Sequence, residues 1–293
     1  MRAQRLKHLR SGTLTLLLSA ALLLPITVFS AGGALPPVET RPANAPYAPA
    51  FDGQTRAPGL RTATPYRVEI LSEVLDAPWA VTALPDGRLA ITQKGGTMRL
   101  YSKETGLGGP ITGFPSVEAG GQGGLLDVAP APDFPRSRVL YFTLAEKTRD
   151  GSLTAVGQGR LAEDDTRIVD FEILYRALPA SRTAAHYGSR LLFGPDGFLY
   201  VTTGERQSAL NRVKAQDLGA AWGKVLRLTP EGRPAPGNPF EGRPGALPEI
   251  YTLGHRNPQS LDLHPESGEI WLGEMGPRGG DELNLLLAGA NYG

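Results

Sequence analysis

The sequence predicts an all-β propeller of about four blades, and three observations lead to that fold class. The 293-residue chain carries 37 Gly and 26 Pro, a turn-rich composition that suits many short strands. One strand–turn–strand unit occurs four times after residue 65. No long segment shows an apolar period of 3.6 residues, so helices should be few and short.

Each repeated unit joins two apolar stretches through Pro-Asp-Gly or a related turn, in which Pro fixes φ and Gly accepts positive φ. The turn markers are 47, 63 and 70 residues apart, which fits propeller blades with insertions. A β-sandwich is the structural alternative, but it would not explain four copies of one unit. The units span residues 79–92, 125–143, 190–203 and 260–272, with markers at Asp86, Asp133, Asp196 and Glu266.

Residues 1–30 have the order of a secretory signal peptide: a basic start, an apolar run over residues 14–29 and a small residue, Ser30. We therefore expect a periplasmic or secreted protein without stable membrane insertion after processing. The alternative is an uncleaved N-terminal membrane anchor, which Pro25 disfavours as a helix. Residues 31–64 are rich in Pro and Ala and predict a linker, and residues 65–293 form the predicted propeller domain.

Bulk charge and cysteine content exclude several function classes. The formal net charge is +1 and no basic run stands in the body of the chain, so nothing supports nucleic-acid binding. The chain has no cysteine, which excludes disulfides, zinc–thiolate sites and thiol nucleophiles.

Polar residues beside glycine mark the ends of several predicted strands. Glycine allows the backbone to approach a ligand closely, and in a propeller such positions gather around the top of the central channel. We expect the functional site there. The clusters are residues 119–125, residues 186–190 with 204–206, residues 254–259 and residues 273–284.

These clusters carry a resemblance that runs from about residue 66 to residue 293. Several motifs in one fixed order make it specific. They include Gly-Gln-Gly-Gly-Leu-Leu-Asp at 121–127, His-Tyr-Gly-Ser-Arg-Leu at 186–191, Gly-Lys-Val-Leu-Arg at 223–227, Gly-His-Arg-Asn-Pro-Gln at 254–259 and Gly-Gly-Asp-Glu-Leu-Asn at 279–284. With these motifs the chain is similar to the soluble aldose sugar dehydrogenases of the glucose/sorbosone dehydrogenase family, six-bladed quinoproteins that use pyrroloquinoline quinone (PQQ) and calcium.

The resemblance implies roles in the oxidation of aldose sugars to lactones, with hydride transfer to PQQ. His186 matches the base that takes the proton of the anomeric hydroxyl, and Glu205 stands where a carboxylate orients that base. Arg256 matches the residue that bonds the reacting quinone oxygen. Gln122 and Asn257 match donors to the cofactor edge.

The resemblance also implies calcium sites. Backbone carbonyls of Gly276 and Pro277 match ligands of the Ca²⁺ that grips the quinone, and Glu282 with the Tyr292 carbonyl matches a second site. Calcium readily accepts such oxygen ligands. The substrate would be an aldose sugar, and the sequence does not identify the electron acceptor.

Other candidate residues have ordinary structural interpretations. We expect His264 to lie exposed in a turn, His255 to be structural beside the site, and Trp79 and Trp271 to belong to blade cores. Asp86 and Asp196 are expected to form turns, as noted for the repeated units.

The chain departs from the family pattern in three places. Glu205 replaces an aspartate, and Met275 replaces the His or Gln before the calcium carbonyls. The family also continues past Gly293 with about two more blades, whose Lys and Arg residues bind the cofactor carboxylates. This last difference favours an alternative function, a non-catalytic or inactive binding propeller. A calcium-dependent hydrolase such as a lactonase is a third hypothesis, but no converging set of carboxylate and Asn ligands is evident.

Overall fold

The computed structural model describes residues 35–42, 58–277 and 280–293, so the predicted signal peptide lies outside the described residues and the predicted linker is described only in part. The chain divides into two compact units. The first, residues 1–41 with 49–63, contains one short ladder of β1 (Leu35–Pro37) and β2 (Pro58–Gly59). Within the described ranges, no helix combines the length and apolarity needed to cross a membrane.

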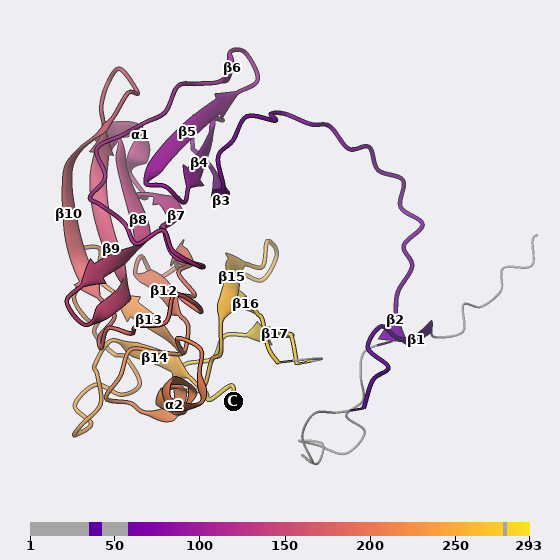
Figure 1. The fold of residues 1–293 in the computed structure, drawn as a ribbon, viewed down its shortest axis with the longest axis vertical. Helices are drawn as coiled ribbons and strands as arrows, with labels where there is room; N and C mark the ends of the chain where they lie inside the picture. Colours follow the sequence, from indigo (N-terminus) through magenta and orange to yellow (C-terminus); the bar gives the residue numbers. More distant parts are fainter. Residues whose placement is uncertain (1–34, 43–57, 278–279) are drawn as a thin grey trace, which may run out of the picture. The chain divides into compact units, whose positions relative to one another are not determined.

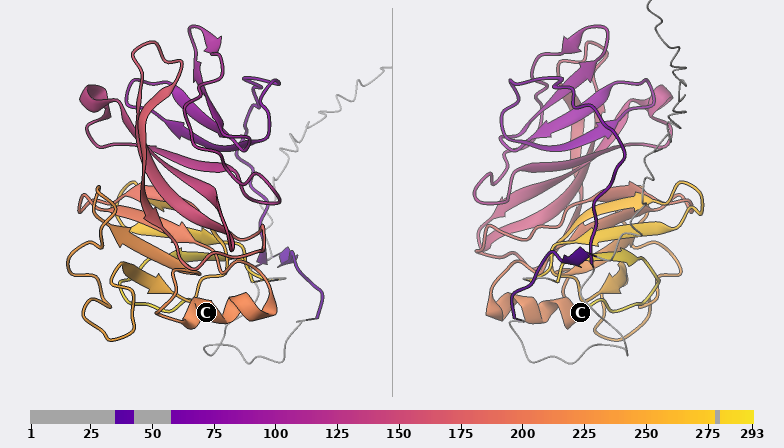
Figure 2. Two further views of the ribbon diagram at one scale, coloured as in Figure 1. Left: turned by 60° about the vertical axis from the view of Figure 1, so that its left-hand side comes forward. Right: turned by 90° about the vertical axis from the view of Figure 1, so that its right-hand side faces the viewer.

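The second unit, residues 42–48 with 64–293, is a propeller of four blades whose strands are antiparallel to their neighbours. Figures 1 and 2 show the blades following one another in chain order. The first blade holds β3 (Pro78–Ala83), β4 (Leu89–Gln93), β5 (Thr97–Ser102) and β6 (Gly106–Leu107), and the second holds β7 (Leu125–Pro130), β8 (Val139–Thr148), β9 (Gly151–Leu161) and β10 (Ile168–Arg176). The third blade holds β11 (Leu191–Phe193), β12 (Leu199–Thr203), β13 (Lys224–Leu228) and β14 (Ile250–Leu253). The fourth holds three strands among the described residues, β15 (Pro258–Leu263), β16 (Ile270–Glu274) and β17 (Glu282–Leu285).

Both main expectations about the fold are confirmed. Each repeated unit of the sequence forms the first two strands of one blade. The helices of the described residues are short: α1 (Phe134–Ser137), α2 (Ala209–Arg212) and the 3₁₀ turn η1 (Val213–Gln216). The turn residues also behave as expected, because the Asp86 and Asp196 side chains accept the backbone N–H groups of Arg88 and Phe198.

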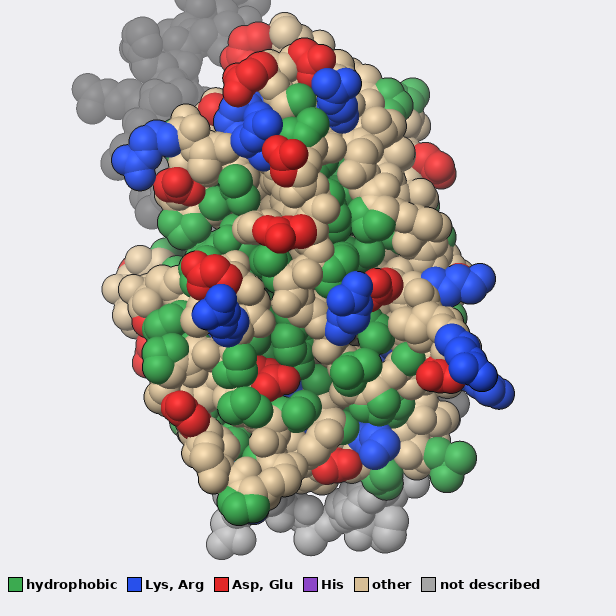
Figure 3. All heavy atoms as spheres, turned by 90° about the vertical axis from the view of Figure 1, so that its left-hand side faces the viewer, with side chains coloured by type: hydrophobic (Ala, Val, Ile, Leu, Met, Phe, Trp, Pro, Cys, Tyr) green, Lys and Arg blue, Asp and Glu red, His purple; other side chains and the backbone are tan. Residues whose placement is uncertain are grey.

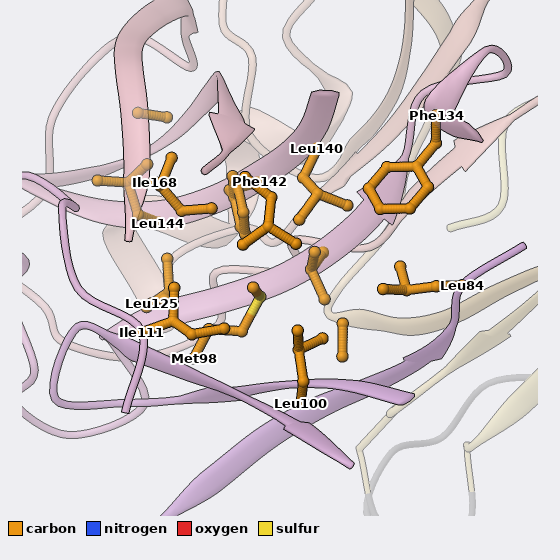
Figure 4. Packing of buried hydrophobic residues seen from close by; sticks show 14 of the residues in the cluster. Leu84, Met98, Leu100, Ile111, Leu125, Phe134, Leu140, Phe142, Leu144 and Ile168 are labelled. Carbon is orange, nitrogen blue, oxygen red and sulfur yellow. The ribbon is translucent and has the colours of Figure 1, made fainter. Parts of the chain in front are cut away.

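Apolar side chains pack between consecutive blades, and alternation along each strand decides which neighbour they face. In β8, Leu140, Phe142 and Leu144 pack toward the first blade, as Figure 4 shows, whereas Tyr141 packs toward the third. These four side chains are at most 5% exposed. Burying each one contributes about 1.5–3 kcal/mol, so β8 is stabilised from both sides. A third cluster, around Leu272, joins the third and fourth blades.

Threonine hydroxyls link each blade to the next. Thr92 Oγ1 accepts the N–H of Ala80 within the first blade at 3.1 Å and donates to the carbonyl of Leu126 in the second. Thr143 Oγ1 accepts the N–H of Asp127 at 2.9 Å and donates to the carbonyl of Ser189 at 2.7 Å.

The same bridge occurs at the next junction. Thr202 Oγ1 accepts the N–H of Arg190 at 2.9 Å and donates to the carbonyl of Pro258 at 3.1 Å. All three threonines are fully buried. The fourth blade has Gly273 in the corresponding register, paired with Ser260, so the bridge is built three times in the described chain. We call Thr92, Thr143 and Thr202 the bridging threonines.

Acidic and basic side chains are interspersed over the face shown in Figure 3, and no extended field of one sign covers it. This mixed surface fits the nearly balanced formal charge of the chain.

We expect Thr143→Val to lower the free energy of unfolding by about 2 kcal/mol, because the isosteric valine leaves a buried N–H and a buried carbonyl without partners. Urea denaturation followed by circular dichroism measures the change. Thr97→Val is the matched control, since Thr97 lies half-buried in β5 and its hydroxyl bonds no described residue. Equal stability of the two variants would show that the bridging threonines contribute nothing.

Candidate functional site

His186 lies in the loop before β11 with its side chain buried, and it is held in a left-handed backbone conformation, φ +49°. For a residue with a side chain this conformation is strained, and such strain clusters at functional sites. Its Nδ1 lies 3.0 Å from Oε1 of Glu205, a buried residue just past the end of β12. Because a carboxylate accepts, Nδ1 carries the proton and Nε2 is left as a base. Nε2 makes no hydrogen bond with any described residue.

Glu205 is one of the predicted departures from the family pattern, and only one of its two carboxylate oxygens has a partner among the described residues. One oxygen, Oε1, meets His186, whereas Oε2 is buried without a hydrogen-bond partner among the described residues. An unpaired buried carboxylate oxygen is costly, so the His186–Glu205 pair is not fully satisfied.

Gln122 and Asn257 are both fixed through their amide oxygens. Gln122 Oε1 accepts the backbone N–H of His186 at 2.7 Å, and Asn257 Oδ1 accepts the N–H of Gly188 at 3.1 Å. A backbone N–H can only donate, so the orientation of both amides is determined. Their NH₂ groups have no partner among the described residues and are free to donate to a ligand.

Arg256 lies in the loop before β15 and connects this loop to the His186 site. Its carbonyl accepts the N–H of Glu205 at 2.8 Å, and its Nη1 donates to the carbonyl of Met275 at 2.8 Å. The remaining guanidinium N–H groups bond no described residue. The structure thus brings together Gln122, His186, Glu205, Arg256 and Asn257, which come from the loops that lead into the second, third and fourth blades and from the end of β12.

No hydrogen bond joins the pair Gly276–Pro277 to Glu282 or Tyr292, the two sets of residues predicted to bind calcium, within the described part of the chain. Gly276 and Pro277 follow β16, and the carbonyl of Pro277 accepts the N–H of Gly280 at 2.6 Å. Glu282 begins β17 and bonds Asn284, whereas Tyr292 bonds the carbonyl of Leu285 at the other end of that strand. No cluster of three or more His, Cys, Asp or Glu side chains suited to a metal is found among the described residues. Calcium binding stays a prediction.

Arg206 is a positioning residue whose role was not predicted from the sequence. Its guanidinium is fully buried, lies 3.8 Å from the ring centroid of Tyr187, and donates to the carbonyls of Ser152, Thr183 and Ala185. Burial lowers the pKa of this guanidinium, and the neighbouring Tyr187 and Glu205 oppose that shift. Arg206 therefore connects the second blade to the loop in which His186 lies.

A second His–Glu pair was also missed, although its spacing is visible in the sequence. His255 Nδ1 lies 2.7 Å from Oε2 of Glu274, and these two residues are 19 apart in the chain, as are His186 and Glu205. The expectation that His255 is structural agrees with its complete burial, and His264 lies exposed as predicted. The repeated interval of 19 residues is the signal that could have revealed the pair.

A family model described as "Glucose / Sorbosone dehydrogenase" matches residues 75–293. The chain belongs to this family. The aldose sugar dehydrogenase YliI of Escherichia coli strain K12 is 45% identical over 228 residues, a match that covers 77% of this chain and 61% of that protein. The chain thus spans about three-fifths of that relative's length.

Solved structures give the same result for this member of the family. The soluble aldose sugar dehydrogenase of Escherichia coli in its apo form superposes with a TM-score of 0.73 at 44% identity, covering 77% of this chain and 65% of that one. The PQQ-bound aldose sugar dehydrogenase of Streptomyces coelicolor superposes with a TM-score of 0.68 at 31% identity, covering 77% and 64%. The propeller fold is therefore shared with both.

Gly204 tests how closely the site loops must approach each other. A Cβ at this position would lie 2.1 Å from the carbonyl oxygen of His186 and 3.0 Å from Oδ1 of Asn257. We expect Gly204→Ala to lower stability by about 1–3 kcal/mol, as overpacking does, and to shift the His186 ring resonances in NMR spectra.

Gly109→Ala is the matched control for this substitution, because a Cβ there meets nothing within 4 Å. Unchanged His186 resonances in Gly204→Ala, with stability equal to that of the control, would contradict the close approach of these loops.

Proposed function

We propose that this chain carries the reactive site of a PQQ-dependent aldose dehydrogenase, which oxidises the anomeric hydroxyl of an aldose sugar to a lactone. One observation carries the proposal: a buried, carboxylate-backed imidazole keeps Nε2 free beside three side chains with unused N–H donors. PQQ, when bound, would supply the hydride acceptor for this reaction. The PQQ-bound structure of a family member supports the choice of cofactor.

The donor set fits an oxygen-rich, anionic, planar cofactor. Gln122 and Asn257 offer amide N–H groups whose direction is fixed by their bonds to backbone. Arg256 adds a positive charge and bidentate geometry, which suit adjacent oxygen atoms. These three residues would hold the quinone edge, and the carbonyls of Gly276 and Pro277 would bind a Ca²⁺ at the same edge.

His186 would act as the general base. Its Nε2 takes the proton of the anomeric hydroxyl as the C–H bond of the sugar breaks, and Glu205 stabilises the imidazolium that forms. Arg256 would donate to the acceptor oxygen on which negative charge grows, and a fixed cation there would lower the barrier. General-base help of this kind contributes about 10²–10⁴ in rate.

The second His–Glu pair offers an internal comparison that favours His186 as the base. In that pair the remaining ring nitrogen, Nε2 of His255, lies 2.8 Å from the hydroxyl of Thr252, and the ring is fully buried. A histidine with both nitrogens occupied cannot take a proton from a substrate, whereas His186 can.

Residues 1–30 support export, so we place the proposed reaction in the periplasm or outside the cell, with electrons passing to an acceptor that the chain itself does not specify. The aldose sugar and this acceptor would be the chain's partners.

Reconstitution tests the proposal directly. The purified chain is titrated with PQQ in the presence of calcium, binding is followed by quenching of tryptophan fluorescence, and reduction of an artificial dye is measured with glucose and other aldoses. We expect saturable binding and sugar-dependent dye reduction, both lost with a calcium chelator. Binding without oxidation of any aldose would favour the alternative of a non-catalytic binding propeller, and absence of binding would contradict the proposal.

We expect His186→Ala to reduce turnover by about 100-fold or more, because general-base help is lost, while PQQ affinity changes little. Steady-state kinetics and fluorescence titration measure the two quantities. His264→Asn is the control, since His264 lies exposed in a turn and asparagine can still accept the N–H groups that its Nδ1 accepts. Turnover that is equal in His186→Ala and in the wild-type chain would contradict the assignment of His186 as the base.

A further inference from the structure

Arg256 is held on both sides of its backbone by the two glutamates of the His–Glu pairs. Its carbonyl accepts the N–H of Glu205 at 2.8 Å. Its own N–H donates to Oε1 of Glu274. The two pairs, which lie in successive blades, therefore meet at the residue that presents the only guanidinium among the donors of the proposed site.

The Glu274 pair is fully satisfied, unlike the pair of Glu205. Glu274 Oε2 bonds His255 Nδ1 at 2.7 Å, and Oε1 is taken by Arg256. The other ring nitrogen of His255, Nε2, is paired with the hydroxyl of Thr252, and the ring stacks on that of Tyr292, with centroids 4.9 Å apart. Both oxygens of the Glu274 carboxylate are occupied, and its partner His255 is bonded at both ring nitrogens and stacked on one face. Glu274 therefore has one orientation, which it transmits to Arg256.

Contacts beyond Glu274 extend this fixation to the side chain. Nη1 of Arg256 donates to the carbonyl of Met275, the residue after Glu274, and the N–H of Met275 donates to the carbonyl of Asn257 at 3.1 Å. The end of β16 therefore fixes the backbone of Arg256 and Asn257 and one nitrogen of the guanidinium, while leaving the other guanidinium N–H groups free.

We propose that Glu274, together with His255 and Thr252, is a positioning residue that sets the direction of the Arg256 guanidinium toward the cofactor. The proposal rests on the proposed function, because it assumes that Arg256 donates to PQQ. Glu274 itself touches neither cofactor nor substrate. It acts through the N–H of Arg256, in the way that outer-shell partners fix the ligands of metal sites.

The conservative variant should retain this role. In Glu274→Gln the amide oxygen can still accept the N–H of Arg256, and the amide NH₂ can donate to Nδ1 of His255 if the imidazole proton moves to Nε2 and is donated to Thr252. Glu274→Ala removes both bonds. We expect Glu274→Ala to weaken PQQ binding about tenfold and Glu274→Gln to change it less than about threefold, judged from outer-shell substitutions in other sites.

A double-mutant cycle decides whether Glu274 acts through Arg256. PQQ dissociation constants are measured by fluorescence for the wild-type chain, Glu274→Ala, Arg256→Ala and the double variant. We expect Glu274→Ala to have no further effect when Arg256 is already alanine, because coupled residues are non-additive. The same tenfold loss in both backgrounds would overturn the proposal and leave Glu274 with a merely structural role.

Glu249→Ala is the matched control for the loss of a buried carboxylate. Glu249, which directly precedes β14 of the third blade, is 7% exposed, like Glu274, and accepts the hydroxyl of Tyr175 in β10 of the second blade at 2.6 Å. We expect its variant to lose stability without a change in PQQ affinity. A tenfold loss of affinity in Glu249→Ala as well would contradict the specific coupling.

A second readout does not need the cofactor and separates this proposal from the proposed function. Hydrogen exchange in the chain without PQQ should show the Arg256 amide protected, with exchange at least about ten times faster in Glu274→Ala and unchanged in Glu249→Ala. If the wild-type chain fails to bind PQQ but shows this pattern, the proposed function is wrong and the fixation of Arg256 stands. An Arg256 amide that exchanges equally fast in all three proteins would refute the fixation.

Discussion

The fold depends on satisfying backbone groups at the junctions between blades. Strands within a blade pair with each other, but the chain leading into each innermost strand presents carbonyls to the previous blade, and buried carbonyls without partners are costly. The bridging threonines Thr92, Thr143 and Thr202 meet this requirement, since each hydroxyl accepts from its own blade and donates to the next. The relative placement of consecutive blades is set by these bonds as well as by apolar packing.

Arg190, which directly precedes β11 of the third blade, also links the blades through its side chain. It donates to the carbonyl of Gln259 in the fourth blade at 2.7 Å and to Asp127 of the second at 3.3 Å, and its guanidinium lies 4.5 Å from the ring centroid of Trp79 in the first. Burial raises the pKa of Asp127, which the nearby Arg190 and the N–H of Leu191 oppose. One cation thus contacts three other blades. The site loops lead into these innermost strands, so the fixed spacing of the strands places the donors of separate blades around one imidazole.

Much of this arrangement was predictable from the sequence, and the reasons differ between residues. Strand pairs around Pro-Asp-Gly turns are local, so the first two strands of each blade could be located. The outer strands carry no such turn marker and were not predicted. His186 and Gln122 stood in specific motifs, so their assignment followed from resemblance, and the structure shows that they are in contact.

Other features required the three-dimensional structure. The roles of Arg206 and Glu274 depend on which carbonyls and amides of distant loops lie near them, and residue type alone does not show this. The glycines beside the site illustrate the same point. The sequence suggested that they admit a ligand, whereas Gly188 and Gly204 admit the backbone of the neighbouring site loops: a Cβ at Gly188 would lie 2.7 Å from the carbonyl carbon of Thr203.

A crystal structure of the chain soaked with PQQ and calcium tests the central claim most directly. The account predicts the quinone edge within hydrogen-bond distance of the amide NH₂ groups of Gln122 and Asn257 and of the Arg256 guanidinium, with Nε2 of His186 facing an open space large enough for a sugar. PQQ bound elsewhere on the propeller, or Nε2 of His186 occupied by a protein group in the complex, would contradict it.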